Sequence, residues 1–561
     1  MRKKIILFIL LEIFPFFSFG YDFNTCLSIF KEEKFIEAGS CFHKIKDKHL
    51  APYKQYYLNL ISQIYDDEEK NITKETAIKN YYLLSKTARA FYKKNYNFAE
   101  KYLKKIDYKA LDEENFIFYL YLKANILNDN SLKKILATKY IYNRAYGYKT
   151  FLEIYQNLSQ TELWQAVETL ISKRMYLRAE GILPLIKSSD KKRYYLLYIY
   201  VKNKKYDKAK QLLKTINPKT KWYLSALYIL IYYLKNWKEK RELFRKLLKT
   251  NDKKYIGKVA TFLAKKAFHL KRLSEFNFYK LYMPNSETKV WYEFLHKYFF
   301  ISKRKAFKYL SKNSKSISNK NKLNYWLYLS SKEKKYLNFV KNSPNFDFYK
   351  ILARGENNFK PKHLFTNNLK EDYILVKKLK QLGLYDKAYK EAKYLYKKEK
   401  DVKQIYTVMP EVVIKNLKEE YRFIKPFGEL NPLVYATMKQ ESLFYYKAIS
   451  VSNAVGLMQF IPSTAYWISK VRKDKNFDIV KMFNPKVSID YGKWYLNYLL
   501  KRFNGNVFYT ISAYNGGEHN VIRNIKRFNP KNIAEFIETH PFDETRNYLK
   551  KVYTNYVIYK N

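Results

Sequence analysis

The sequence predicts an all-α protein with more than one domain, and three observations support this. The chain has 561 residues, which is too long for a single hydrophobic core. It contains only 13 glycines and 14 prolines, so it is poor in the residues that the tight turns of an all-β protein need. Hydrophobic residues make up 47% of the chain and aromatic residues 19%, which is enough to build cores between long helices.

The N-terminus, MRKKIILFILLEIFPFFSFG, has the order of a secretory signal peptide. A basic start at residues 2–4 precedes an apolar stretch at residues 5–19, and Ser18 and Gly20 are small residues that suit a cleavage site. The apolar stretch is shorter than the roughly 20 residues that a membrane-spanning helix needs. We therefore expect residues 1–20 to direct export and to be removed, with a retained anchor as the alternative.

The two cysteines of the chain, Cys26 and Cys41, follow this segment directly. In an oxidising compartment a helix–turn–helix could bring them together as a disulfide, and the alternative is two small buried apolar side chains. The seven histidines are scattered without the spacing of metal ligands, so we expect neither a metal site nor a cofactor.

Residues 21–360 have the pattern of successive helical hairpins. A short turn rich in lysine and asparagine recurs, followed by a motif in which an aromatic residue precedes an alanine by three positions. A large ring next to a small residue on one helix face suits close packing inside a hairpin, and stacked hairpins form a superhelix. The array resembles a degenerate tetratricopeptide-like repeat, with an unrelated helical bundle as the alternative. The motif begins at Phe35, Tyr96, Tyr176, Tyr206 and, in a helical connecting segment predicted for residues 361–408, Tyr385.

The formal net charge of +57 favours association with a polyanion. Compositional drift toward lysine explains the same charge, because the lysines are spread along the whole chain. The chain has neither an RNA-recognition signature nor zinc-finger spacing, so we expect no nucleic-acid partner. Peripheral association with an anionic cell wall or membrane surface stays open.

Glu441 is the first candidate for a chemical role. In the segment NPLVYATMKQES, Asn431 suits a helix N-cap and Pro432 suits the first helical position. Glu441 then falls on an apolar stripe with Val434 and Thr437, near the C-terminal end of the helix. Burial and the negative end of the helix dipole both disfavour a carboxylate, which would raise its pKa from about 4.3 toward ~6. The alternative is a helix-end glutamate that reaches solvent.

Further polar residues follow at positions that can reach a cleft. Ser450 offers a hydroxyl, and a segment of small residues ends at Gln459. Gly492 interrupts a predicted helix at a cost of about 1 kcal/mol relative to alanine, which indicates close helix packing. Tyr514 and Asn515 directly precede a Gly-Gly bend. Taken singly, each has an ordinary explanation in core packing or turn chemistry.

Taken together, five blocks of sequence resemble the soluble lytic murein transglycosylases. The blocks are QES, S…AVGLMQFIPSTA, NPKVSIDYGKWYL, AYNGG and PFDETRNYL, and their order and spacing match the catalytic domain of that family. The resemblance covers residues 409–561 and implies a goose-type-lysozyme-like α-helical fold there. Residues upstream match the family's helical region in architecture and weak pattern alone.

The chain departs from the family pattern at two places that bear on the site. Asn453 stands where the family usually has glycine, and asparagine tolerates a left-handed backbone. Glu518 and His519 replace the usual Pro-Gly after AYNGG, which leaves the edge of the cleft and its preference for subsites open.

The resemblance implies a lyase reaction on peptidoglycan glycan strands in the periplasm. Glu441 would protonate the β-1,4 glycosidic oxygen between N-acetylmuramic acid and N-acetylglucosamine, and would then act as the base. The C6 hydroxyl would close a 1,6-anhydro ring without consuming water. A hydrolytic muramidase and a non-catalytic glycan-binding helical scaffold stay open as alternatives, as does binding of other cell-wall proteins through the superhelix.

The resemblance also implies residues that bind the substrate. Four residues would hold the sugars and orient the acid, one would line the cleft, and two near the C-terminus would complete it. For Glu544, one of these last two, the alternative is an ion pair at the start of a helix. In chain order the seven residues are Ser450, Met458, Gln459, Tyr514, Asn515, Glu544 and Tyr548.

Overall fold

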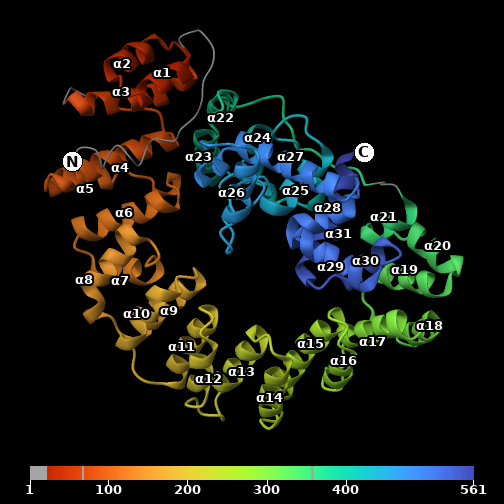
Figure 1. The fold of residues 1–561 in the computed structure, drawn as a ribbon. Coiled ribbons are helices and arrows are strands. Elements are labelled where there is room, and N and C mark those ends of the chain that lie inside the picture. The colour runs from red at the N-terminus through yellow and green to blue at the C-terminus, as the bar shows by residue number, and fades with distance from the viewer. Residues whose placement is uncertain (1–21, 66–68, 356–358, 561) are drawn as a thin grey trace. The chain divides into compact units, whose positions relative to one another are not determined.

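The computed structural model describes residues 22–65, 69–355 and 359–560 (Figure 1). These residues form 31 α-helices joined by short turns and 3-10 segments. Among them, extended pairing is limited to two isolated bridges, Ile449 with Val455 and Val455 with Phe460. The all-α prediction is confirmed.

The predicted signal peptide, residues 1–20, lies outside the described residues. Within the described ranges, every helix is too short or too polar to span a membrane.

Contacts divide the chain into two compact units, each made of two stretches of sequence. The first unit comprises Met1–Thr169 and His363–Pro426, and the second comprises Leu170–Lys362 and Phe427–Asn561. The boundaries at residues 360 and 408 that the sequence suggests stay predictions.

The first unit contains the N-terminal hairpins and three helices from later in the chain. Its helices are α1 (Phe23–Lys31), α2 (Phe35–Lys44), α3 (Ala51–Tyr65), α4 (Ala77–Tyr92), α5 (Tyr96–Leu103), α6 (Glu113–Ile126), α7 (Asn130–Lys139), α8 (Lys149–Ile154), α9 (Gln160–Ser172), α22 (Glu371–Gln381), α23 (Tyr385–Glu399) and α24 (Val402–Val408).

The second unit contains the remaining hairpins and the C-terminal helices. Its helices are α10 (Tyr176–Ile182), α11 (Asp190–Lys202), α12 (Tyr206–Leu213), α13 (Lys221–Tyr233), α14 (Trp237–Leu248), α15 (Lys253–His269), α16 (Leu273–Lys280), α17 (Glu287–Phe300), α18 (Lys303–Lys312), α19 (Lys320–Ser331), α20 (Lys334–Asn342), α21 (Phe348–Arg354), α25 (Pro432–Ser442), α26 (Pro462–Val471), α27 (Pro485–Arg502), α28 (Val507–Gly516), α29 (Glu518–Phe528), α30 (Ile533–Thr539) and α31 (Asp543–Lys560).

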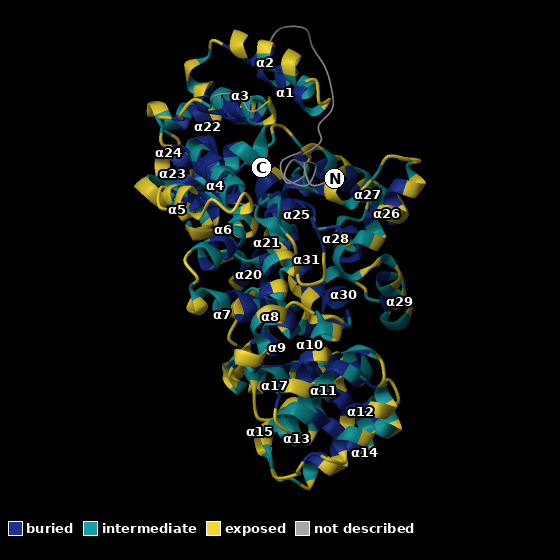
Figure 2. Cartoon of the chain, turned by 90° about the vertical axis from the view of Figure 1, so that its left-hand side faces the viewer, coloured by how far each residue is buried: buried dark blue, intermediate teal, exposed yellow. Residues whose placement is uncertain are grey.

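The hairpin motif read from the sequence marks helix starts. Helices α2, α5, α10, α12 and α23 each begin at the aromatic residue of the motif, and the alanine three positions later is fully buried in each. The residue two positions before each start has a positive φ, between 57° and 73°. One left-handed residue therefore reverses the chain in all five hairpins. Figure 2 shows that helices such as α11–α14 carry both buried and exposed residues, as amphipathic hairpin helices do.

Cys26 of α1 and Cys41 of α2 form a disulfide across the first hairpin, with their Cα atoms 5.3 Å apart. This separation lies within the range that a disulfide spans, roughly 4.4–6.8 Å. The bond links the two helices that begin the described part of the chain.

Glu391 on α23 joins this helix to the N-terminal hairpins of the first unit. Its carboxylate is buried and accepts hydrogen bonds from the Tyr53 hydroxyl at 2.8 Å and from the amides of Ala77 at 2.9 Å and Ile78 at 3.1 Å. These two amides belong to the first turn of α4, where the helix dipole favours a negative charge. Residues more than 300 positions apart are thus joined by one side chain.

Helix α31 is the centre of the C-terminal part of the second unit, where it packs against α25, α28, α21 and α30. Next to it, Glu538 at the end of α30 is buried and accepts from the Trp291 indole at 2.9 Å and the Lys550 ammonium at 3.0 Å. Burial opposes ionisation, but the nearby cations Lys550, Lys322 and Arg546 hold the pKa of Glu538 well below its usual range. The carboxylate therefore stays charged inside the fold.

Arg546 anchors α31 to helices α15 and α17. Its guanidinium contacts His269 Nε2 at 2.9 Å and donates to the Tyr292 hydroxyl at 3.1 Å and the His540 carbonyl at 2.5 Å. Burial and the adjacent Arg546 charge lower the pKa of His269 well below its usual range, so the imidazole is neutral and can accept from Arg546. One side of α31 is thereby fixed against helices from the middle of the chain.

Replacing Glu391 with alanine should destabilise the start of α4. The change leaves two amides and one phenol without their buried acceptor, at a cost of about 3 kcal/mol. We expect faster hydrogen–deuterium exchange in peptides that cover residues 76–84. The control is Glu100→Ala on α5, which removes an exposed ion pair with Lys104 that contributes less than about 0.5 kcal/mol. Equal protection of residues 76–84 in both variants would contradict this role.

Candidate active site

Glu441 lies in the last turn of α25, as the sequence predicts. Asn431 caps this helix by accepting from the Leu433 amide at 2.8 Å, and Pro432 is the first helical residue. The helix ends one residue after Glu441, at Ser442, where Leu443 and Phe444 follow with φ values of 47° and 64°. The carboxyl group therefore stands at the negative end of the helix dipole, where ionisation is disfavoured.

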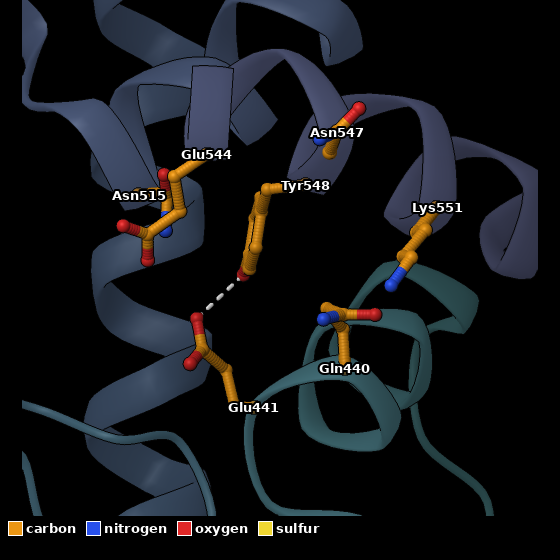
Figure 3. Close-up of a pocket in the computed structure, with 7 residues that line it drawn as sticks. All are labelled: Gln440, Glu441, Asn515, Glu544, Asn547, Tyr548 and Lys551. Atoms are coloured by element: carbon orange, nitrogen blue, oxygen red, sulfur yellow. Dashed lines mark hydrogen bonds between the residues drawn. The ribbon is translucent and has the colours of Figure 1, made fainter. Parts of the chain in front are cut away.

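The Glu441 carboxyl faces a pocket of about 310 Å³, which is large enough for part of a small ligand. Tyr548 on α31 points at it, and its hydroxyl donates to Glu441 Oε1 at 2.6 Å (Figure 3). This contact places Tyr548, a residue that the sequence assigns to the cleft, directly against the candidate acid. The lining residues are Gln440, Glu441, Asn515, Glu544, Asn547, Tyr548 and Lys551.

Burial raises the pKa of Glu441 to about 7. The hydrogen bond from Tyr548 opposes the shift because it stabilises the carboxylate, whereas the charge of Glu544 adds to it. The direction agrees with the sequence-based prediction. A carboxyl group of this kind holds a proton through the mildly acidic range and releases it near neutrality.

Ser450 folds the loop that follows α25. Its hydroxyl oxygen accepts from the amides of Ser452 at 3.1 Å and Ala454 at 3.0 Å. Asn453, between them, has a φ of 60°, which confirms that asparagine takes the left-handed conformation expected here. The described contacts of Ser450 are thus with backbone of its own loop, and its contact with a sugar stays a prediction.

Gln459 and Tyr514 hold the next part of the loop. The Gln459 side-chain amide donates to the carbonyls of Ala448 at 2.9 Å and Gly456 at 2.8 Å. The Tyr514 hydroxyl donates to the Met458 carbonyl at 2.7 Å. Tyr514 lies on α28, so this bond fixes the loop to that helix. The residue after Tyr514, Asn515, lines the pocket.

Met458 is fully buried beneath this loop and packs against α27. A Cβ atom added at Gly492 would lie 2.5 Å from Met458 Cε, so packing at this glycine is close, as predicted, but the neighbour is a side chain of the loop and not another helix. Gly456 has a φ of 78°, and an added Cβ there would meet the Met482 carbonyl oxygen at 2.1 Å. A direct contact of Met458 with a ligand stays a prediction.

Asn515 and Glu544 stand side by side at the pocket, one on α28 and one on α31 (Figure 3). The Thr545 hydroxyl donates to Asn515 Oδ1 at 2.7 Å and so joins the two helices. The alternative for Glu544 was an ion pair at the helix start, and among the described residues it is Asp543 that pairs with Arg546 there.

Three residues that line the pocket were missed at the sequence level, namely Gln440, Asn547 and Lys551. Asn547 and Lys551 lie three and seven positions after Glu544 on the same helix, which places them on one face. Helical periodicity, counted from Glu544, could therefore have predicted Asn547 and Lys551 as pocket residues. Gln440 directly precedes Glu441 and had no signal beyond this position.

A comparison of the sequence with known families finds one matching model. It is described as "Transglycosylase SLT domain" and matches residues 425–537, which include Glu441. The C-terminal part of the chain is an SLT transglycosylase domain. Helices α25–α30 and the loop after Glu441 fall within the match, or nearly so, and α31 follows it. The recognition of this domain from five sequence blocks is confirmed.

Two curated proteins are similar in sequence to part of the chain. Membrane-bound lytic murein transglycosylase C of Actinobacillus pleuropneumoniae serotype 5b is 32% identical, over 23% of this chain and 42% of that relative. Soluble lytic murein transglycosylase of Escherichia coli K12 is 32% identical, over 21% of this chain and 18% of that relative. The chain thus matches less than half the length of these relatives.

Two solved structures are similar over nearly the whole chain. The 70 kDa soluble lytic transglycosylase Slt70 of Escherichia coli has a TM-score of 0.60 and 14% identity, with 96% of each chain covered. The lytic transglycosylase Slt of Pseudomonas aeruginosa has a TM-score of 0.51 and 16% identity, with 97% of each chain covered. These similarities confirm the predicted fold class, helical hairpins followed by an α-helical C-terminal domain.

Replacing Glu441 with glutamine should stabilise the protein above pH 7. The carboxyl pKa is about 4.5 in an unfolded chain and about 7 in the fold, so folding is increasingly penalised as pH rises between these values. Glutamine stays neutral and avoids a penalty of up to about 3 kcal/mol. Calorimetric melting at pH 5 and pH 8 measures this difference.

The control for this experiment is Glu242→Gln, which changes an exposed glutamate on α14 in the same unit. We expect the gain in melting temperature of Glu441→Gln over wild type to grow from pH 5 to pH 8, and that of the control to stay constant. A gain that is the same at both pH values would contradict the burial of the Glu441 charge.

Proposed function

We propose that this protein is an exported lytic transglycosylase that cleaves peptidoglycan glycan strands in the periplasm. The bond broken is the β-1,4 bond between N-acetylmuramic acid and N-acetylglucosamine, and the product carries a 1,6-anhydro ring. The observation that carries the proposal is the half-buried Glu441, with a pKa of about 7 and a phenol on one oxygen, in the pocket of an SLT domain. The names of the curated relatives agree with this reaction class.

Glu441 begins the reaction as a general acid. Tyr548 donates to Oε1, so the proton to be transferred resides on Oε2, the oxygen that Figure 3 shows turned away from Tyr548. As the bond from the anomeric carbon to the glycosidic oxygen breaks, this proton passes to the leaving oxygen. The departing sugar leaves as an alcohol, and Glu441 becomes a carboxylate that Tyr548 stabilises.

Glu441 then acts as the base. The acetamido group of the substrate stabilises the positive anomeric carbon, and the carboxylate removes the proton of the C6 hydroxyl on the same sugar. The C6 oxygen bonds to the anomeric carbon and closes the anhydro ring. Glu441 is protonated again, so the cycle is balanced without water.

The pocket supplies groups that suit an N-acetylated sugar. Gln440, Asn515 and Asn547 bring side-chain amides to the lining, and amides bond hydroxyl and acetamido groups in both directions. Lys551 adds a cation at the same lining, and the whole chain is strongly basic, which favours a polymer that carries carboxylates.

A hydrolytic muramidase is the second candidate, and Glu544 is the observation that favours it. Glycosidases that use water pair the acid with a second carboxylate, and Glu544 lines the same pocket as Glu441. The products distinguish the two reactions, because hydrolysis leaves reducing ends and transglycosylation leaves anhydro ends.

Glu441→Gln should abolish the release of anhydro-muropeptides from purified sacculi, with a rate loss of about 10³-fold or more, because glutamine has no proton to give. Binding of the variant to sacculi in a pelleting assay should be retained, since the shape of the pocket is kept. Mass spectrometry of the digest measures both the rate and the type of end.

The exposed control Glu242→Gln should digest sacculi at the wild-type rate. Wild-type digests that contain reducing ends alone would contradict the transglycosylase reaction in favour of hydrolysis. Unchanged cleavage by Glu441→Gln would rule out Glu441 as the acid.

The rate of cleavage should fall as pH rises through about 7, because the reaction needs protonated Glu441. Tyr548→Phe removes a hydrogen bond that stabilises the carboxylate, so the falling limb should move to higher pH while the maximal rate drops. Glu544→Gln removes a negative charge that disfavours the carboxylate, so the limb should move to lower pH. Initial rates between pH 5 and pH 9 measure the shifts, and shifts of both variants in one direction would be inconsistent with this electrostatic arrangement.

A further inference from the structure

A group of aromatic side chains lies on the surface of the SLT domain, outside the residues that line the pocket. It consists of Trp467 on α26 and Trp494 and Tyr498 on α27, and is called here the aromatic platform. The rings of Trp494 and Tyr498 are nearly parallel, at 6°, with centroids 5.7 Å apart. Trp467 stands across them, with its centroid 5.3 Å from Tyr498 and 6.0 Å from Trp494.

The platform is accessible from solvent. Trp467 is 40% exposed, and Trp494 and Tyr498 are half-buried. On the same helix as Trp467, Val471 is 49% exposed, and Ile461 directly before the helix is 42% exposed. Contiguous exposed apolar surface that is bordered by polar residues marks a binding site.

A continuous series of ring contacts connects the platform to the pocket. Tyr495 lies next to Tyr498, with centroids 6.1 Å apart and planes at 9°. On its other side, the Tyr495 centroid is 5.5 Å from that of Tyr514, the residue before the pocket residue Asn515. Burial and the nearby charge of Glu441 both raise the pKa of Tyr514, which places Tyr514 within electrostatic reach of the candidate acid. The platform thus lies a few ring widths from the pocket.

Polar groups border the platform at the rim where the chain departs from the family pattern. The Tyr498 hydroxyl donates to Glu518 Oε2 at 3.3 Å, and Arg502 Nε lies 3.8 Å from the same oxygen. His519, next in the chain, is largely exposed. The Glu518–His519 pair therefore supplies charged and hydrogen-bonding groups beside the exposed rings.

We propose that the aromatic platform binds a sugar of the same glycan strand, away from the bond that is cleaved. This inference rests on the proposed function. A pyranose ring presents a face of C–H bonds that packs on aromatic rings, while its hydroxyls at the ring edge need polar partners. The platform offers both, since Trp467 and Trp494 supply apolar faces and Tyr498, Glu518 and Arg502 supply the polar border.

The substrate chemistry selects a glycan over other occupants. A lipid or an apolar protein helix on the platform would remove water from the Glu518–Arg502 ion pair and offer no hydrogen bond in its place, which costs free energy of desolvation. A glycan carries hydroxyls that can replace that solvent. The continuity of the rings with the pocket also fits a polymer that occupies both places at once.

The test measures binding of the hexamer of β-1,4-linked N-acetylglucosamine by calorimetry, in the Glu441→Gln protein so that the probe is not consumed. Adding Trp467→Ala should weaken binding roughly 3- to 10-fold, the effect of one lost aromatic contact. Trp467→Phe keeps a ring at this position and should retain most of the affinity, which separates loss of stacking from misfolding.

The matched control is Tyr466→Ala in the same background. Tyr466 is the neighbouring residue on α26 and is 46% exposed, but its ring packs against Phe477, away from the platform. The affinity of this variant should equal that of the parent. Equal affinities of the Trp467→Ala variant and the parent, equal losses in Trp467→Ala and Tyr466→Ala, or a parent that does not bind the hexamer would each overturn the inference.

The sacculus digest with otherwise wild-type protein keeps this inference separate from the proposed reaction. Cleavage to anhydro ends without platform-dependent binding overturns the platform alone. Platform-dependent binding without cleavage overturns the proposed reaction and leaves the platform as a glycan-binding surface.

Discussion

The anchoring of α31 is the constraint on which the candidate active site depends. On one side of this helix, Arg546 and Lys550 are held by buried partners from α15, α17 and α30. On another side, Tyr548 meets Glu441, and Glu544 contributes the charge that helps to raise its pKa. The position of one phenol hydroxyl relative to one carboxyl is thereby set by packing in the middle of the chain. In this sense the helices upstream are part of the site, although they contribute no residue to its lining.

Two glutamates of this region, Glu538 and Glu441, have pKa values that are shifted in opposite directions. Glu538 is buried among cations and keeps its charge, which ties the helices together. Glu441 is half-buried, and the groups that shift its pKa are Tyr548 and Glu544, neither of which is a cation. It therefore holds its proton to near neutrality. The surrounding charges, more than burial itself, decide whether a carboxyl group serves as a structural anion or as an acid.

Local features of the fold could be predicted from the sequence, and long-range ones could not. The hairpin starts and Glu441 at a helix end follow from patterns within a few residues, and so does the left-handed Asn453. The bonds of Glu391 to α4 and of Arg546 to His269 join residues about 300 positions apart, and a single sequence contains no signal for such pairs. The pocket residues on α31 lie between these cases, because periodicity relates them to one another but does not say which element they face.

The left-handed turns show how the hairpin architecture tolerates an unusual composition. Among the described residues, 16 positions other than glycine have a positive φ, and lysine or asparagine occupies 11 of them. Each such residue costs about 1 kcal/mol relative to glycine in the folded state, and part of that cost is offset because a residue with a side chain has less conformational entropy to lose on folding than glycine has. The net cost at each turn is small, and the buried hairpin contacts outweigh it. A chain of this design can lose glycine and gain lysine over evolutionary time while each hairpin still closes at the same residue.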